Sequence, residues 1–211
     1  MIEETRNFWE SLRGSYQYHD CGFSVFYSPV RRNPDLMLVG FNPGGAASDF
    51  HLPRAMSVPK VHDYFSPEWD YSLASEMRQL FRQAGKIREL RDSVKTNTRF
   101  FRCPSRAWDA IPSQVRQEMG QFCDPRLVGM RAELEPRIVV TEGLEAFEIV
   151  RRLMWPASEP HALLRQGPAR ACVRAVDERG RKLLGLIHLT GARVSAETKC
   201  HLADILTSEL A

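Results

Sequence analysis

The stretch LMLVGFNPGG, from Leu36 to Gly45, decides the fold of this chain. It begins with an uninterrupted apolar run, which is typical of a central strand buried on both faces of a sheet. It then breaks into Asn-Pro-Gly-Gly, whose backbone preferences predict a sharp turn directly after the strand. Ligands of open α/β sheets bind at the carboxyl ends of the strands, so Asn42 would project its amide into the binding crevice. For these four residues taken alone, an ordinary strand-to-loop turn is the simpler explanation.

Other apolar stretches predict the remaining strands of the same sheet. Runs at 94–103, 137–141 and 183–189 indicate three further buried strands. The other expected segments are helices at 1–13, 72–85, 86–91, 124–136, 143–155 and 195–210, a loop at 46–69, a short edge strand at 21–28 and a hairpin partner at 171–176. The alternation of strands and helices predicts an α/β fold, a three-layer α/β/α sandwich with a central, mainly parallel four-stranded sheet.

The composition is that of a globular protein with one domain. The chain has 211 residues, of which 43% are hydrophobic and 26% charged, and this length suits a single domain over residues 1–211. The net charge of +3 permits nucleic acid as a partner without arguing for it. No apolar run is long enough to span a bilayer, so we expect a cytoplasmic monomer without a membrane partner.

The cysteines favour reduced thiols over disulfides or a metal centre. There are five of them, an odd number, and no pair has the Cys-x-x-Cys spacing of a zinc or iron–sulfur site. The six histidines are scattered as well, and none has ligand spacing to another. We therefore expect no metal and no cofactor.

Conspicuous polar residues accompany three of the four inner strands. Asn42 follows the first strand, Asn97 lies within the second, and His188 opens the segment HLTGARVS after the last. Because the carboxyl ends of parallel strands meet at one edge of a sheet, these side chains are predicted to gather there.

Four segments together resemble the uracil-DNA glycosylase superfamily. GFNPGG is similar to its first motif, in the form with Asn in third place that is found in the mismatch-specific and single-strand-selective branches. TNTRFFRCP resembles the internal strand that bears an Asn, and HLTGARVS resembles the second active-site motif. The segment AMSVP at 55–59 resembles the part that carries a base-stacking aromatic and a phosphate-binding Ser. The segments occur in the order of the family and span about Leu36 to Ser195.

The resemblance implies hydrolysis of the N-glycosidic bond of uracil or another damaged base that has been flipped out of DNA. Asn42 would position the water, and His188 would donate a hydrogen bond to the negative charge that develops on the leaving base. Asn97 offers a donor and an acceptor that match a base edge. Met56 stands where the family has a stacking aromatic, and Phe41 or Phe50 could supply the ring instead.

The remaining motif residues would contact the DNA backbone. Small side chains and backbone N–H groups at Gly44, Ser57, Thr190 and Gly191 are expected to hold phosphates. Arg193 lies in the loop after His188, where the family places the residue that enters the space left by the extruded base. The implied partner is DNA that contains a damaged base.

Simpler structural explanations exist for these residues. Asn97 could satisfy backbone groups at a strand end, His188 could be a hydrogen-bonded core histidine, and Ser57 could be an ordinary turn residue. Arg193 could be a solvated surface charge. Two other functions also stay open: a catalytically inactive nucleic-acid-binding module of the same fold, and an enzyme acting on a free nucleoside or nucleotide, with the Gly-rich turn on its phosphate.

Overall fold

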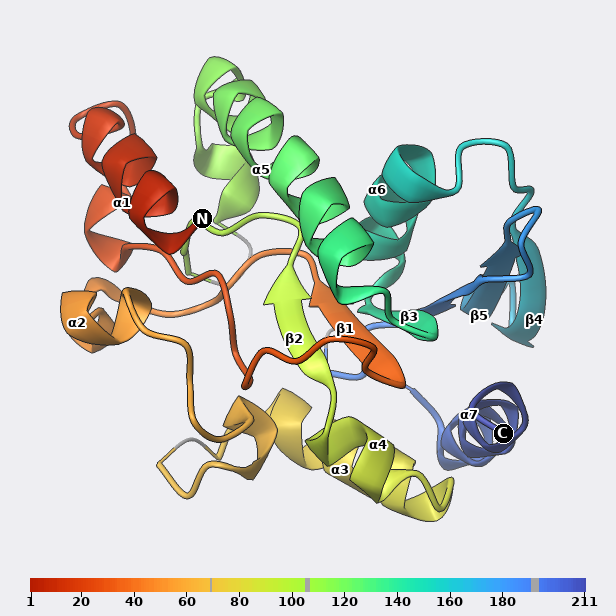
Figure 1. The fold of residues 1–211 in the computed structure, drawn as a ribbon. Coiled ribbons are helices and arrows are strands. Elements are labelled where there is room, and N and C mark those ends of the chain that lie inside the picture. The colour runs from red at the N-terminus through yellow and green to blue at the C-terminus, as the bar shows by residue number, and fades with distance from the viewer. Residues whose placement is uncertain (69, 105–106, 191–193) are drawn as a thin grey trace.

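The computed structural model describes residues 1–68, 70–104, 107–190 and 194–211. These residues form an α/β/α sandwich around one six-stranded sheet (Figure 1). The strands are β1 (Leu36–Gly40), β2 (Val94–Asn97), β3 (Ile138–Glu142), β4 (His161–Gln166), β5 (Ala169–Val176) and β6 (Lys182–Leu186). Their order across the sheet is β2-β1-β3-β6-β5-β4, and the first four run parallel. Strands β5 and β4 continue the sheet as an antiparallel hairpin.

Helices cover both faces of the sheet (Figure 1). One face carries α1 (Ile2–Ser11), α5 (Ser113–Leu134) and α6 (Leu144–Met154), and the other carries α3 (Ser72–Gln83), α4 (Ile87–Arg91) and α7 (Ala196–Glu209). A short helix, α2 (Leu52–Ala55), lies in the long loop after β1. Alternate residues of β1 enter the two cores, Met37 and Val39 on the α5 face and Leu36 and Leu38 on the α3 face. This two-sided burial explains why the strand is apolar throughout.

The predicted sandwich with a mainly parallel sheet is confirmed, but the prediction of four strands was wrong. The hairpin β4–β5 adds two strands beyond β6. Residues 171–176 of β5 match the predicted hairpin partner, whereas β4 has no counterpart among the predicted strands. Its six residues are exposed or half-buried and its pairing with β5 is irregular, so its sequence shows neither a buried run nor a clean alternation.

Strand β2 ends earlier than predicted, at Asn97 instead of Cys103. Beyond this point the Thr98 hydroxyl donates to the Phe41 carbonyl, at 2.7 Å, and the chain turns to bury Phe100 and Phe101 in the core beneath α1 and α5. Asn97 therefore lies at the carboxyl end of its strand, level with the end of β1.

The segment 21–28 is not the predicted edge strand. It runs beside β2 with scattered hydrogen bonds: the Tyr27 amide donates to the Lys95 carbonyl, at 2.9 Å, and the Thr96 hydroxyl donates to the Val25 carbonyl, at 2.7 Å. A single isolated bridge joins Phe23 to Phe101. Its aromatic and β-branched residues are there to fill the core, and this composition alone does not require regular pairing.

Helix α5 also begins before its predicted start at Asp124, because Pro125 lies inside it and not at its beginning. Burial of Met119, Cys123 and Leu127 along one face holds the helix together across the missing amide hydrogen of Pro125. Among the described residues, no helix has the length and apolar character needed to cross a membrane.

Candidate functional site

The carboxyl ends of three parallel strands bring Asn97, Gly40 and Glu142 into one row. The register pairs Gly40 with Asn97 on one side and with Glu142 on the other. All three positions share the face of Leu36 and Leu38, which is covered by α3 and α7. A Cβ atom at Gly40 would overlap the Asn97 Oδ1 atom and would lie 3.3 Å from the Glu142 Oε2 atom. The Asn97 amide thus fills the place that a side chain at Gly40 would take, and the Glu142 carboxylate lies next to it.

Asn97 is buried and its amide is unpaired. The residue is 5% exposed, yet its side chain makes no hydrogen bond within the described part of the chain. Its polar atoms are not fully buried, so the amide keeps a narrow contact with solvent. A buried amide is normally satisfied by the protein, and this one is available to a ligand.

Replacing Gly40 with alanine should displace the Asn97 amide. The new Cβ overlaps Asn97 Oδ1, so we expect a loss of about 1–3 kcal/mol in unfolding free energy, as for other overpacked sites. Gly129 provides the control, because it lies in α5 with no atom within 4 Å of an added Cβ, and alanine there should be neutral or stabilising. Urea unfolding of both variants measures the difference. Equal stability of the two would mean that the row tolerates a side chain at Gly40.

A buried group of charges lies beneath the row. Glu142 accepts a hydrogen bond from the Tyr64 hydroxyl through Oε1, and its Oε2 atom lies 3.9 Å from Lys95 Nζ. Lys95 Nζ also lies 3.4 Å from Asp63 Oδ2, which accepts a 2.5 Å hydrogen bond from the Tyr71 hydroxyl. Asp63, Lys95 and Glu142 are each at most 7% exposed. One lysine therefore faces two carboxylates in a site shielded from water.

Burial and mutual attraction shift these pKa values in opposite ways. Burial acts to raise the pKa of Asp63, but the Lys95 ammonium and the hydrogen bonds from its neighbours outweigh it and hold the value below the ordinary one. Burial acts to lower the pKa of Lys95, and the two carboxylates raise it overall. The pKa of Tyr64 lies well above its usual value because the phenol is buried and faces the Glu142 carboxylate. Asp63 and Lys95 are thus held in their charged forms and Tyr64 in its neutral form.

Asn42 lies in the turn after β1, anchored through its amide nitrogen. Nδ2 donates to the Pro43 carbonyl at 3.2 Å and to Cys103 Sγ at 3.1 Å. Burial raises the pKa of Cys103 to about 11 although the hydrogen bond from Asn42 opposes the shift, so the group is a thiol that serves as a weak acceptor. The Asn42 Oδ1 atom accepts no hydrogen bond from the residues that the structure describes. It can accept one from a water molecule.

Arg102 fastens this turn to the rest of the protein. Its guanidinium donates to the carbonyls of Gly44 and Cys21, at 3.1 and 3.2 Å, and forms an ion pair with Asp49 at 3.2 Å. Gly45 has a φ of 127°, and a Cβ there would overlap the same guanidinium. Gly45 therefore allows the turn to approach Arg102 closely, and the Gly44 carbonyl is bound to protein.

His188 lies just beyond β6, at the same edge of the sheet. Its ring and Cβ lie 3.8 Å from the position of a Cβ on Gly143, the residue after β3, and its Nδ1 atom lies 3.3 Å from the Thr190 hydroxyl. The imidazole is exposed, which excludes the alternative of a core histidine. Gly191 and Arg193, the other predicted residues of this loop, lie outside the described residues.

The proposed stacking and phosphate residues lie around the long loop after β1. The Phe41 ring contacts Trp108 edge to face, with centroids 5.3 Å apart. Met56 is half-buried against the core on the α5 face. Ser57 is exposed, and its hydroxyl donates to the Arg54 carbonyl at 2.9 Å, as in an ordinary helix end. Phe50 packs on Trp9, at 5.3 Å between centroids, and so forms part of the core.

Ser93, His62 and Asp63 have the composition of a catalytic triad but the wrong hydrogen-bond directions. His62 Nδ1 accepts the Tyr64 amide hydrogen at 3.1 Å and lies 3.3 Å from Asp63 Oδ1, and Nε2 lies 3.0 Å from the Ser93 oxygen. The Ser93 hydroxyl in turn donates to the Leu90 carbonyl at 2.8 Å. The histidine therefore cannot accept the serine proton, and the group is structural.

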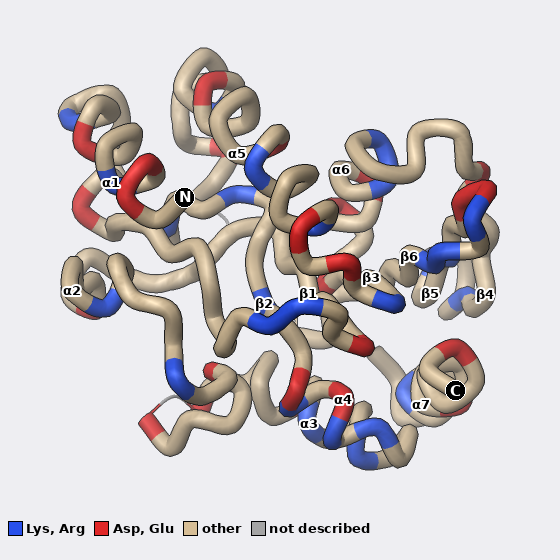
Figure 2. Tube along the Cα trace, viewed as in Figure 1, with Lys and Arg blue, Asp and Glu red and all other residues tan. Residues whose placement is uncertain are grey.

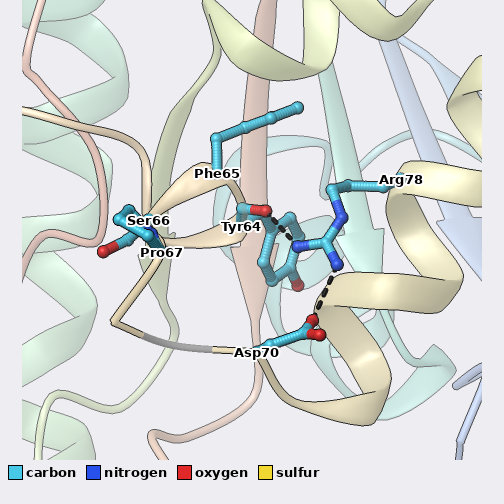
Figure 3. A pocket seen from close by; sticks show the side chains of 6 residues that line it. All are labelled: Tyr64, Phe65, Ser66, Pro67, Asp70 and Arg78. Atoms are coloured by element: carbon cyan, nitrogen blue, oxygen red, sulfur yellow. Dashed lines mark hydrogen bonds and ion pairs between the residues drawn. The ribbon is translucent and has the colours of Figure 1, made fainter.

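A surface hollow lies beside the charge cluster and carries little binding chemistry. It has a volume of about 350 Å³ and is lined by Tyr64, Phe65, Ser66, Pro67, Asp70 and Arg78 (Figure 3). The Arg78 guanidinium is already occupied, by the Tyr64 carbonyl at 2.5 Å and by Asp70 at 2.7 Å. The row at the strand ends is the better candidate site.

Sequence reasoning placed Asn42, Asn97 and His188 at one edge of the sheet, and the structure has all three there. It missed Glu142 and Lys95, although each had a signal: an acidic residue directly after the apolar run RIVVT, and a lysine inside a buried strand. Across the described ranges, no group of three or more His, Cys, Asp or Glu side chains is arranged to hold a metal ion.

Comparisons by sequence identify no relative, so the function is argued from the geometry of the site. Neither the protein-family models nor the curated proteins that were searched contain a match to the chain.

Proposed function

We propose that this protein hydrolyses the N-glycosidic bond of a damaged base that is flipped out of DNA. The observation that carries the proposal is the Asn97 amide, which is buried at the carboxyl end of a parallel strand and has no partner among the described residues. The resemblance of GFNPGG, TNTRFFRCP and HLTGARVS to the uracil-DNA glycosylase superfamily points in the same direction.

An unpaired buried amide stabilises a complex with a ligand of matching polarity. Leaving such a group unsatisfied costs about 1–3 kcal/mol, and a bound ligand that pairs with it removes that cost. A base extruded from the stack exposes donors and acceptors on its edge, and Asn97 offers one of each. The absence of a side chain at the neighbouring Gly40 makes room for the amide itself.

Asn42 and His188 supply the groups that the reaction needs. Cleavage of the glycosidic bond develops positive charge on the sugar and negative charge on the leaving base. The Asn42 oxygen can hold a water molecule for attack on the sugar carbon, since its amide nitrogen is anchored on Pro43 and Cys103. His188 can donate a hydrogen bond to the departing base. This mechanism uses only side chains and water.

The charge pattern is compatible with moderate DNA affinity. Lys and Arg are interspersed with Asp and Glu over the helices and loops of the described chain (Figure 2), and the net charge is +3. We therefore expect a few phosphate contacts, and a salt dependence to match. Most of the specificity would then come from contacts with the extruded base.

The proposal is tested by a base-release assay under single-turnover conditions. Oligonucleotides with uracil, hypoxanthine, xanthine, 7-methylguanine or a thymine mismatch are incubated with the protein, and alkali then cleaves any abasic site. We expect release of at least one base, and a rate about tenfold lower for Asn97→Ala because one recognition group is lost. Asn7→Ala, an exposed asparagine on α1, is the matched control and should leave the rate unchanged.

The same assay separates the alternatives. Salt-dependent DNA binding without release of any base would contradict hydrolysis and leave an inactive binding module. Release from free nucleosides at a rate equal to that from DNA would identify an enzyme of nucleosides instead.

A further inference from the structure

We propose that Glu142 recognises the base together with Asn97, and that this site takes a base whose edge carries two adjacent N–H donors, as the pairing edge of guanine does. This inference rests on the proposed function for the nature of the ligand. Its own basis is the position, the pairing and the charge of Glu142, a residue that the sequence analysis did not single out.

One carboxylate oxygen of Glu142 lies beside the Asn97 amide, above Gly40. Its Oε1 atom is engaged by the Tyr64 hydroxyl. Its Oε2 atom lies 3.3 Å from the point above Gly40 that Asn97 Oδ1 also overlaps. Over the residues that the structure describes, Oε2 accepts no hydrogen bond, and its closest cation, Lys95 Nζ, is 3.9 Å away. Two acceptor oxygens, one from each strand that flanks β1, therefore lie close together above Gly40.

The Glu142 carboxylate has the weaker share of the buried cation. Lys95 Nζ lies between two buried carboxylates and is nearer to Asp63 Oδ2, at 3.4 Å, than to Glu142 Oε2, at 3.9 Å. The His62 Nδ1 atom also contacts Asp63, at 3.3 Å from Oδ1. The buried phenols that surround the lysine, with Tyr27 at 4.6 Å and Tyr64 at 4.5 Å from ring centroid to Nζ, are neutral. A buried carboxylate oxygen without a hydrogen-bond donor favours a ligand that supplies one.

This arrangement discriminates between classes of base. The pairing edge of uracil reads carbonyl, N–H, carbonyl, so one carbonyl oxygen would face a carboxylate when the N–H group meets Asn97. The edge of guanine reads carbonyl, N–H, amino, so its carbonyl can accept from the Asn97 amide while two N–H groups face Asn97 Oδ1 and Glu142 Oε2. A hydrogen bond to a charged acceptor contributes about 1.5–3 kcal/mol, which corresponds to about tenfold or more in affinity.

The decisive experiment measures binding without chemistry. The dissociation constants of 9-methylguanine and 1-methyluracil are determined by calorimetry or ligand-observed NMR. We expect 9-methylguanine to bind about tenfold or more tightly than 1-methyluracil. Glu142→Gln keeps the shape and the acceptor for Tyr64 but removes the charge, so it should weaken 9-methylguanine binding about tenfold and leave 1-methyluracil unchanged or stronger. Glu159→Gln, which removes the same charge from an exposed loop position between α6 and β4, should change neither constant.

Equal affinity for the two ligands, preference for 1-methyluracil, or no binding of 9-methylguanine would overturn the inference. An unchanged preference in Glu142→Gln would overturn it as well, and if that variant does not melt cooperatively the comparison of ligands on the unaltered protein decides alone. Failure of the proposed function looks different. Binding of 9-methylguanine through Glu142 without release of any base from DNA would refute hydrolysis and keep the proposed recognition. Efficient release of uracil in preference to 7-methylguanine would support hydrolysis and refute the proposed recognition.

Discussion

Replacing Asn42 with alanine is expected to slow base release by about 10²-fold in single-turnover assays while DNA binding persists. The side chain is held by two hydrogen bonds from its amide nitrogen, and alanine removes the oxygen that would position the attacking water. A group that acts at the transition state changes the rate of the chemical step more than the affinity.

The matched control for this experiment is again Asn7→Ala, which should retain the full rate. Cys103→Ser tests whether the thiol itself is needed. A serine hydroxyl can still accept the Asn42 amide hydrogen, so this variant should retain most of the activity. A rate for Asn42→Ala equal to that of Asn7→Ala would remove Asn42 from the mechanism.

Replacing Lys95 with methionine is expected to destabilise the fold by about 3–5 kcal/mol at neutral pH, measured by urea unfolding. Methionine fits the space of the lysine stem but leaves Asp63 and Glu142 as buried carboxylates without a cation. The control is Lys199→Met, which removes an ion pair with Glu76 that is partly exposed on both sides, so its loss should stay below about 1 kcal/mol.

The pH dependence of this effect has a definite sign. In the parent protein the pKa of Asp63 lies below its ordinary value, so the stability from this carboxylate is present above the ordinary pKa and is lost as the pH falls through the lowered one. The Lys95→Met variant lacks the part of that contribution that comes from the ammonium, which is the largest one that lowers the pKa. Its deficit relative to the parent should therefore shrink as the pH is lowered from neutral to about 3. A deficit that stays constant over this range would mean that Lys95 acts through packing and not through charge.

The inner strands could be predicted from sequence because two-sided burial leaves a direct mark. LMLVG, RIVVT and LLGL are apolar without alternation, and each forms a parallel strand. The strand β4 leaves no such mark, because its HALLRQ sequence is partly exposed on both faces. The error at Asp124 has a similar cause: Pro125 is a common helix start, and nothing local reveals that buried residues on both sides carry α5 through it.

The site was predictable where it follows the strands and hidden where it depends on distant contacts. Asn42 and His188 directly follow strand ends, so the topology alone brings them together. The contact of Tyr64 with Glu142 joins residues 78 positions apart, and Tyr64 comes from a loop without a regular pattern. The role of Lys95 as the cation between two carboxylates becomes evident only when that loop is seen folded over the strand ends.

The segment beside β2 protects the protein from associating through its sheet. A regular strand at 21–28 would have presented a fresh row of backbone donors and acceptors to other copies of the chain, which is the usual route to edge-to-edge aggregation. Here the backbone of β2 is engaged irregularly, by the Tyr27 amide and by the Ser28 hydroxyl, which accepts the Lys95 amide hydrogen at 2.8 Å. Pro29 follows at once and cannot donate. The irregular contacts thus leave no regular row of backbone donors and acceptors in segment 21–28 for another copy of the chain to pair with, at the edge of the sheet nearest the candidate site.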